Sequence, residues 1–530
     1  MMAFVFPEDH GAIGDGVADD TSAVQSALNA GIVSPTPWAR YRISESLVIP
    51  DGGGIVGIGR TARFIMGASG FNHASELLDT RFDANAVGII VKGQLAGAYT
   101  PHQGCILKDF ILESEVLDGR VLKGIAVLNA LMPVIQGVEI FGLPVSSGIC
   151  LNSVIDGVVE HNYIHDCTTN VSGFALPQIT GIEVDNDLIN GVLSSNININ
   201  FNKIKNLTVG QVTLSEKGYQ TDGINIAREG TISHKVIGNY IENVGEGIDS
   251  FGDGIDISHN TIKNAYVFGI KIIHGGRRSI VSVNNIDGAG LAGITVAGST
   301  SAEDQTERNL ICQNIIERIN FNGAWNANDT AGIKTEDNGG TTKLACQNFI
   351  AHNQINCGGA GKYGIFAGGG GALDLIRDNR VMNATVAETF GDFADIRSAD
   401  KAVVRVAFNA SSAAQNIACS LGGAPSLDVQ EEWVGNVYTA KAHRLLLVSA
   451  QVRTALSPGY ELRCFIRKNG SSVALGSTTS SGGAQIARVQ DVISVTPGDT
   501  ISFAWLHTDP VARSTSADSS MSFMSIAEVG

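Results

Sequence analysis

The sequence predicts an all-β protein in which a right-handed parallel β-helix with an N-terminal capping helix is followed by a C-terminal β-sandwich of the jelly-roll type. Three observations predict this fold. The 530-residue chain contains 63 Gly and is 44% hydrophobic, which is typical of many short strands joined by tight turns. Two sequence patterns recur through the middle of the chain. Near residue 400 they stop, and simple strand alternation follows.

The first segment, residues 1–40, is expected to cap the β-helix. A Gly-rich turn over residues 10–19 precedes a helical pattern in which Asp20 or Thr21 can serve as the N-cap. A helix there would close the end of the solenoid, which otherwise exposes its core and its strand edges. The face that this helix turns inward is expected to hold Ala23, Val24, Ala27 and Leu28.

The second segment, residues 41–398, carries both repeats, and a strand unit that repeats in this way predicts a solenoid. A Gly-Ile pair begins at Gly124, Gly148, Gly181, Gly223, Gly247, Gly269, Gly293, Gly332 and Gly364. An Asn followed two positions later by Ile or Val lies at Asn162, Asn202, Asn239, Asn260, Asn284, Asn314, Asn353 and Asn379. Asn suits a repeated turn, and stacked Asn side chains can bond along the axis of such a stack.

The stretch from His10 to Leu28 closely resembles the N-terminal signature of the pectate-lyase-like superfamily, to which phage tailspikes, pectinases and alginate epimerases belong. The resemblance covers roughly residues 5–395. It implies the right-handed β-helix fold but does not specify a reaction, because unrelated activities share this fold.

The third segment, residues 399–530, is predicted to be a β-sandwich. Alternating patterns predict strands at 445–452, 460–466, 487–495 and 500–505, and turn sequences separate them. The stretches 467–470 and 497–500 resemble the C1q/tumour-necrosis-factor jelly roll, a family that forms trimers. This resemblance implies a homotrimer.

A β-helix followed by a trimeric sandwich resembles a bacteriophage tailspike, which acts as a polysaccharide depolymerase. The resemblance implies a place in the virion tail, assembly in the host cytoplasm, attachment to a phage tail or baseplate protein, and a bacterial surface polysaccharide as ligand. The opening residues 1–7 lack the charged and apolar regions of a secretory signal. The helix motif starts by about residue 10, so any virion-binding module in front of it is expected to be missing or very short.

Bulk properties argue against several classes of partner. The net charge of −16 repels the phosphates of nucleic acid. No apolar run is long enough to span a membrane. The eight Cys show no CxxC spacing, so we expect buried, reduced thiols.

The residue that follows each Gly-Ile pair is expected to point outward, and these residues should stack into one column along the axis. Their middle members are polar and charged. Glu183 and Asp249 should lie two coils apart, roughly 10 Å, close to the separation of carboxylates in inverting glycosidases. The column consists of Ala126, Cys150, Glu183, Asn225, Asp249, Lys271, Thr295, Lys334 and Phe366.

Charged residues concentrate in the stretch 246–256 and in the stretch 268–278 one coil later. We select site candidates from these stretches because paired carboxylates can supply one acid and one base. Glu336 and Asp337 repeat the carboxylate theme further along the chain. A competing interpretation is that outward acid–lysine stacks are ordinary surface ion pairs. The catalytic candidates are Asp249, Glu246, Asp253 and Glu183. The substrate-binding candidates are Lys271, His274, Asp222, Asn225, Asp185 and Arg277.

We expect no cofactor and no resident metal, since the motifs of alginate epimerases and polygalacturonases and the repeated Asp ladder of pectate lyases are absent. The predicted activity is endo-glycosidic hydrolysis of a capsule, exopolysaccharide or O-antigen, because carboxylates outnumber bases in the cluster. One alternative is a lyase that uses His274 or Lys271 as base and a divalent cation to neutralise a uronate. Another alternative is an adhesin that holds the glycan without cleaving it.

Overall fold

The computed structural model describes residues 4–67, 86–93, 100–116, 122–144, 146–169, 179–186, 192–209, 221–227, 231–298, 306–325, 329–336, 347–368, 374–390, 394–395, 403–407, 412–413, 415, 419–420, 425–428, 433–434, 436–440, 444–496, 498–515 and 522–528. The chain forms two compact units. The first comprises Met1–Gly371 and Asp378–Gly391, and the second comprises Ala372–Arg377 and Asp392–Gly530. No helix in the described ranges is long and apolar enough to cross a membrane.

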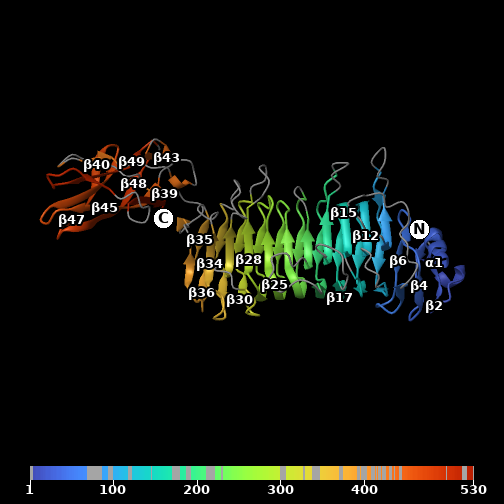
Figure 1. Ribbon diagram of the computed structural model, residues 1–530. Helices are drawn as coiled ribbons and strands as arrows, with labels where there is room; N and C mark the ends of the chain where they lie inside the picture. Colours follow the sequence, from blue (N-terminus) through green and yellow to red (C-terminus); the bar gives the residue numbers. More distant parts are fainter. Residues whose placement is uncertain are drawn as a thin grey trace. The chain divides into compact units, whose positions relative to one another are not determined.

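The first unit is a right-handed parallel β-helix built from three series of stacked strands (Figure 1). The first series contains β1 (Phe4–Val5), β3 (Ile32–Val33), β6 (Gly54–Val56), β10 (Ile106–Lys108), β13 (Val134–Gln136), β16 (Val158–Glu160), β19 (Asn198–Asn200), β22 (Lys235–Ile237), β24 (Asp256–Ser258), β26 (Ile280–Ser282), β29 (Leu310–Cys312) and β32 (Phe349–Ala351). Each strand pairs in parallel with the next, as the fixed repeat predicts.

The other two series share one larger sheet, because β23 and β25 each run through both. The second series contains β2 (Asp15–Asp19), β4 (Arg40–Ile43), β7 (Arg63–Met66), β11 (Ile111–Ser114), β14 (Glu139–Phe141), β17 (Tyr163–Thr169), β20 (Lys203–Val209), β23 (Tyr240–Ser250), β25 (Thr261–Ile272), β27 (Asn285–Ala289), β30 (Ile315–Ile319), β33 (Gln354–Asn356) and β36 (Arg380–Met382). The third contains β5 (Leu47–Ile49), β8 (Ala86–Lys92), β12 (Leu122–Leu131) with β9 (His102–Gln103) beside it, β15 (Ser146–Ile155), β18 (Ile179–Asp185), β21 (Thr221–Ile226), the ends of β23 and β25, β28 (Ala292–Ala297), β31 (Ala331–Glu336), β34 (Tyr363–Gly368) and β37 (Ala387–Phe390).

The Gly-Ile repeat marks the third strand series and has a steric cause. Each Ile of the pair is buried in the core, and each Gly lies against the carbonyl oxygen of the Gly in the next coil. A Cβ at Gly247 would sit 2.3 Å from the oxygen of Gly269, and the other members of the column are as tight, at 2.5–2.8 Å. Coils can stack at this corner only when the residue there has no side chain.

The Asn repeat forms a continuous ladder inside the stack, as the sequence predicts. Each Asn from Asn162 to Asn353 donates its Nδ2–H to Oδ1 of the Asn one coil further on, at 2.8–3.0 Å. The last acceptor is Asn379. Each of these side chains also donates to a backbone carbonyl of the preceding coil, for example Asn239 to Ile199. The ladder therefore satisfies a row of buried amides that would otherwise be costly.

The N-terminal end of the stack is closed by α1 (Thr21–Ala30), preceded by the short helix η1 (Pro7–His10) (Figure 1). The four predicted inward residues of α1 are all buried, which confirms the amphipathic pattern. Asp20 occupies the N-cap position but does not cap with its side chain. Its carboxylate instead accepts the backbone N–H groups of Ile13 and Gly14, at 2.7 and 3.1 Å, and so holds the Gly-rich turn against the helix.

The second unit contains two antiparallel sheets that share one hydrophobic core. One sheet has the order β42 (Pro425–Asp428), β39 (Val403–Ala407), β51 (Phe523–Glu528), β45 (Arg444–Leu456) and β48 (Gly483–Val495). The other has the order β43 (Trp433–Val434), β44 (Val437–Thr439), β49 (Thr500–His507), β46 (Glu461–Lys468) and β47 (Ser471–Thr479), with β41 (Cys419–Ser420) beside β49. One short antiparallel pair, β40 (Ser412–Ala413) with β50 (Arg513–Ser514), also belongs to this unit. β35 (Leu375–Arg377) and β38 (Ala394–Asp395) pair in parallel and are the last two strands of the 14-stranded sheet.

The four strands predicted in this unit correspond to β45, β46, β48 and β49, whose alternate residues enter the core. The sequence did not reveal β47, because its Ser- and Gly-rich edge is mostly exposed. Asn469 and Gly470 both have positive φ, 50° and 80°, and form the tight turn between β46 and β47. Six cysteines of the described chain are free thiols, and Cys312 is the one among them that is not fully buried.

His234 introduces a pH-dependent weakness into the β-helix core. Its Nδ1 accepts the backbone N–H of Ile197 at 3.1 Å, and burial lowers the pKa of the ring to about 3. The unfolded chain protonates near 6.5, so the unfolded state binds the extra proton as pH falls from about 6.5 toward 3. Stability is therefore expected to fall in that window, by on the order of 4 kcal/mol.

Replacing His234 by Asn tests this expectation. Asn309 accepts a backbone N–H at the equivalent position of a later coil, so H234N keeps the acceptor and removes the titration. We expect unfolding midpoints of H234N to vary less between pH 7 and pH 4 than those of the wild type. Equal slopes would show that acid lability arises elsewhere.

Candidate functional site

The column of residues that follow the Gly-Ile pairs forms as predicted on the third strand series. Strand register aligns Glu183 with Asn225, Asn225 with Asp249, and Asp249 with Lys271. The same register continues through Thr295 and Lys334 to Phe366. Glu183 and Asp249 are thus two coils apart, with no coil skipped. The middle of the column is buried, with Asp249 only 2% and Lys334 0% exposed.

The centre of the site is a buried cluster of two carboxyl groups around one ammonium group. Lys271 Nζ lies 2.5 Å from Glu246 Oε2 and 2.8 Å from Asp249 Oδ2. Glu246 precedes Gly247 in β23, and Asp249 follows the Ile of the same pair, so one strand presents both groups. The neighbouring strand β25 supplies Lys271 through its register with Asp249.

Two further polar residues of β21 border this cluster. Asp222 aligns with Glu246, and Asn225 aligns with Asp249. Asn225 donates from Nδ2 to Asp222 Oδ2 at 2.8 Å. All five side chains are buried, so the cluster contains three carboxyl groups, one amide and one lysine in a nearly dry environment. Asp249, Glu246, Lys271, Asp222 and Asn225, all predicted from the sequence, are brought together here.

Burial separates the protonation states of this cluster. It raises the pKa of Glu246 to about 8, against the opposing charge of Lys271 and with the support of the nearby Asp249 and Asp222 carboxylates. Burial also raises the pKa of Asp249, again opposed by Lys271. Burial alone would lower the pKa of Lys271, but Asp249 and Glu246 outweigh it and shift that pKa upward. At neutral pH the arrangement holds Glu246 as a neutral acid beside a charged Lys271.

Several buried oxygens of the cluster make no hydrogen bond to another described residue, among them Glu246 Oε1, Asp249 Oδ1 and Asn225 Oδ1. An unpaired buried polar atom costs free energy, so native proteins rarely retain one without a functional reason. Glu246 Oε1 and Asp249 Oδ1 can each accept a hydrogen bond from a hydroxyl group of a bound molecule.

His274 lies at the end of β25, next to this cluster. Its backbone is in the left-handed region with φ 52°, and its ring packs edge-to-face on Phe251 with centroids 5.0 Å apart. Its electrostatic interaction with Asp249 helps to lower the pKa of that carboxyl. His274 therefore belongs to the surroundings of the cluster, as the sequence predicts.

Glu183 and Asp185 occupy a separate part of the same face. Glu183 accepts a hydrogen bond from Ser147 and lies 2.9 Å from the Nζ of Lys123. Burial favours the neutral acid, but Lys123 and Ser147 outweigh it and lower the pKa of Glu183. Asp185 accepts the backbone N–H of Asn186 at 2.7 Å. The structure thus gives Glu183 an ion pair of its own, outside the central cluster.

Asp253, another predicted catalytic residue, has contacts different from those of the Glu246–Asp249–Lys271 cluster. Its carboxylate lies 3.0 Å from Arg277 Nε and also pairs with Arg278. Despite the opposing effect of burial, hydrogen bonds from both arginines lower its pKa. Arg277 and Arg278 are largely exposed, so this group is a surface ion pair. Asp253 lies three residues beyond the end of β23, where its backbone forms a bridge with Arg277.

The sequence did not predict two lysine–carboxylate contacts on this face. Lys123 precedes Gly124 as Glu246 precedes Gly247, so its position in the Gly-Ile repeat could have marked Lys123 as a candidate. Lys334 Nζ contacts Asp329 and lies 2.7 Å from Glu336 Oε2. Asp329 lies ahead of β31 and follows no repeat, so no sequence pattern marked it. Asp337 lies outside the described residues. In the described ranges, no group of His, Cys, Asp and Glu is arranged to hold a metal ion.

The comparisons with known proteins show the fold. No family model matches the chain. The surface adhesin PfbA of Streptococcus pneumoniae is 14% identical, with 73% of this chain and 93% of that chain aligned and a TM-score of 0.50. A double mutant of the tailspike of E. coli bacteriophage HK620, in complex with a pentasaccharide, is 10% identical over 94% and 93% of the two chains, with a TM-score of 0.48. An alpha-1,3-glucanase of Streptomyces thermodiastaticus is 14% identical over 73% and 70%, with a TM-score of 0.43.

Proposed function

We propose that this protein binds a bacterial surface polysaccharide along the third strand series and hydrolyses it internally at Glu246 and Asp249. One observation carries the proposal: two buried carboxyl groups share Lys271, and one of them, Glu246, has a pKa of about 8. A carboxylic acid that is neutral at pH 7 beside a second carboxyl group is the arrangement that glycoside hydrolysis requires.

In this mechanism Glu246 protonates the oxygen of the scissile glycosidic bond, and the departing sugar leaves with that proton. Asp249 attacks the anomeric carbon as the glycosidic bond breaks; water then displaces Asp249 from that carbon, and Glu246, now ionised, accepts a proton from the water. The two ion pairs share Lys271 Nζ, so their carboxyl oxygens are no further apart than the two contacts combined. This upper limit is shorter than the ~6.5–9.5 Å separation of inverting enzymes and is compatible with the ~5–5.5 Å of retaining enzymes. The geometry therefore favours retention at Glu246 and Asp249 over inversion across Glu183 and Asp249.

The charge of the cluster disfavours the lyase alternative. Asp222, Glu246 and Asp249 face a single Lys271, so the site has an excess of carboxyl groups. A uronate substrate would bring a further carboxylate into this region, and β-elimination needs a cation to neutralise it. We therefore favour hydrolysis over cleavage by a lyase.

Incubation of the purified protein with a panel of bacterial capsular, exopolysaccharide and O-antigen polysaccharides tests the proposal. The expected result is the release of new reducing ends without ultraviolet absorbance from unsaturated uronate. New ends with that absorbance would establish a lyase. Absence of both cleavage and binding across the panel would overturn the proposal.

The cleavage rate is expected to fall as pH rises through about 8. Glu246 must be protonated to act as the acid, and burial places its pKa near that value. On the acid side, activity is expected to fall as Asp249 becomes protonated, at a pH above the ordinary range of an aspartate because its pKa is raised. Initial rates of reducing-end release across pH 4–10 measure both limbs. A rate that keeps rising above pH 9 would contradict the role of Glu246.

A second candidate function is glycan binding without cleavage. The contacts of Lys271 with both carboxyl groups favour it, because a lysine that holds two carboxyl groups in place can form a rigid binding surface. An adhesin would bind a polysaccharide of the panel and release no ends. Replacing Asp249 by Asn would then leave affinity intact with no activity to lose.

We further propose that the chain is a subunit of a homotrimeric phage tailspike, located in the virion tail and attached to a tail or baseplate protein. The outer face of β45 and β48 supports association through the second unit, because Leu445 and Val492 are 45% and 48% exposed there. A solution mass of three chains is the expected result, and a monomeric mass would overturn this assembly.

A further inference from the structure

We propose that Phe366, Asp329 and Glu336 form a second sugar subsite, which takes an uncharged, hydroxyl-bearing unit of the same glycan that occupies the Glu246–Asp249 site. The inference rests on the proposed function and specifies its substrate further. It concerns a separate group of residues on β31, β34 and the turn ahead of β31.

The polar part of this subsite is held in place by a buried lysine. Lys334 is fully buried, and its Nζ contacts Asp329 Oδ2 and lies 2.7 Å from Glu336 Oε2. The two carboxylates are more accessible, with side chains 29% and 17% exposed. Lys334 thus fixes two acceptors at a partly open surface, and carboxylates fixed in this way accept hydrogen bonds from sugar hydroxyl groups.

The apolar part is the ring of Phe366, which follows Lys334 in the column. The ring is partly exposed, 5.1 Å from the ring of Tyr363 and 6.0 Å from Lys334 Nζ. Gly368 makes room for it, since a Cβ there would lie 2.7 Å from Phe366 Cε1. An accessible ring beside fixed polar groups is the combination that binds a sugar, which has both an apolar face and hydroxyl groups.

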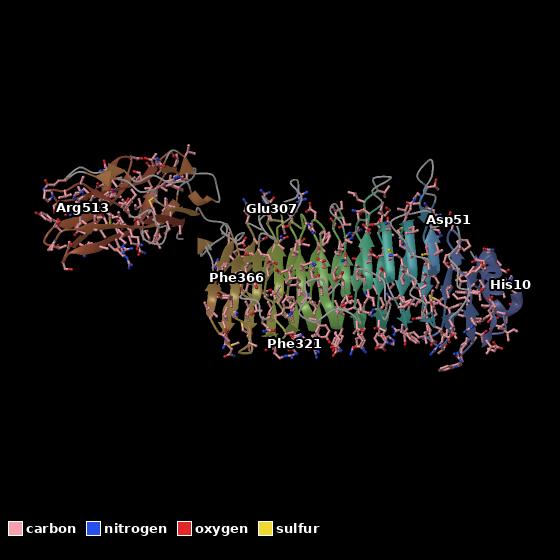
Figure 2. All side chains as sticks on the ribbon, viewed as in Figure 1. His10, Asp51, Glu307, Phe321, Phe366 and Arg513 are labelled. Atoms are coloured by element: carbon pink, nitrogen blue, oxygen red, sulfur yellow. The ribbon has the colours of Figure 1, made fainter. Side chains whose placement is uncertain are left out.

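The position of the subsite fits a glycan that runs along the helix axis. Lys271 aligns with Thr295 and Thr295 with Lys334, so two coils separate the clusters. At ~4.8 Å per coil this is roughly 10 Å. One extended oligosaccharide can therefore reach both places. The direction leads toward the C-terminal end of the stack, where Phe366 is labelled in Figure 2.

The charges of the subsite set the ligand class. Asp329 and Glu336 outnumber Lys334, and the Glu246–Asp249 cluster has the same excess of carboxyl groups. An acidic sugar unit would be repelled at both places, whereas an uncharged unit loses no binding free energy to charge repulsion. We therefore infer a neutral glycan at this face.

Replacing Phe366 by Leu tests the subsite, because Leu keeps apolar bulk and removes the ring face. The probes are short and long fragments of the panel polysaccharide that the wild type binds, obtained by partial acid hydrolysis. We expect F366L to bind the long fragments about tenfold more weakly, to bind the short ones unchanged, and to keep its unfolding midpoint. F321L is the matched control, since Phe321 is a partly exposed ring elsewhere on the β-helix (Figure 2).

The possible outcomes distinguish a failure of the subsite from a failure of the proposed function. Equal affinity of F366L and wild type for long fragments overturns the subsite and leaves the proposed function standing. Loss of affinity in F321L as large as in F366L also overturns it. No binding by the wild type to any polysaccharide of the panel overturns the proposed function and the subsite together.

Discussion

Glu246→Gln and Asp249→Asn are each expected to lower kcat/KM for polysaccharide cleavage at pH 7 by about three orders of magnitude, within the range that acid–base and nucleophilic groups contribute. Gln cannot donate the proton that Glu246 holds through its raised pKa. Asn cannot supply the negative charge of Asp249. Both substitutions keep the shape of the side chain, so binding of the polysaccharide should change little. Reducing-end assays and binding measurements on the same protein samples check the two expectations.

Asp253→Asn is the matched control for this pair. It makes the same chemical change four positions from Asp249, in a carboxylate whose partners are Arg277 and Arg278. We expect D253N to retain cleavage. The upper limb of the pH profile offers a second check, because E246Q should lose the decline near pH 8 along with most of its activity. Cleavage at the wild-type rate by E246Q would show that Glu246 is not the acid, and the same result for D249N would show that Asp249 is not the nucleophile.

The repeats predict the fold well because the physical cause of each repeat is local. A Gly is required wherever its Cβ would strike the carbonyl of the next coil, and an Asn is required wherever the previous amide needs a partner. Both requirements recur at every coil, so they remain visible in one sequence. The column from Glu183 to Lys334 follows from the same register, and the sequence predicts its order correctly.

The environment of the column does not follow from the repeat. Whether Asp249 is open or 2% exposed depends on neighbouring coils and on the segments between strands, which vary in length and sequence. The partner of each carboxylate also depends on side-chain reach across coils. Glu183 therefore pairs with Lys123 from two coils earlier, although Lys123 lies before its Gly-Ile pair and Glu183 lies after its own. Asp253 is only four positions from Asp249 in the sequence, but its carboxylate pairs with Arg277 and Arg278.

The second large effect is expected at Lys271. Replacing it by Met leaves Glu246 and Asp249 buried with no cation, and a buried carboxylate that loses its partner costs about 3–5 kcal/mol. Burial already raises the pKa of Glu246 from 4.5 to about 8, so the folded state holds more protons than the unfolded state between those values. Stability from this group is present below pH 4.5 and is lost as pH rises toward 8. Without Lys271 the pKa rises further, so the loss in K271M should be small at pH 4 and largest at pH 8.

Two comparisons isolate the electrostatic origin of this effect. Lys205→Met also removes a lysine that pairs with a glutamate. Lys205 and Glu242 are each more than a fifth exposed, so a loss of stability of less than about 1 kcal/mol is expected. The triple variant K271M/E246Q/D249N removes all three charges together and should recover most of the stability that K271M loses. Unfolding midpoints at pH 4 and pH 8 decide the matter. If K271M is equally destabilised at both pH values, the loss comes from packing of the lysine stem, and the cluster does not carry the protonation states on which the proposed hydrolysis depends.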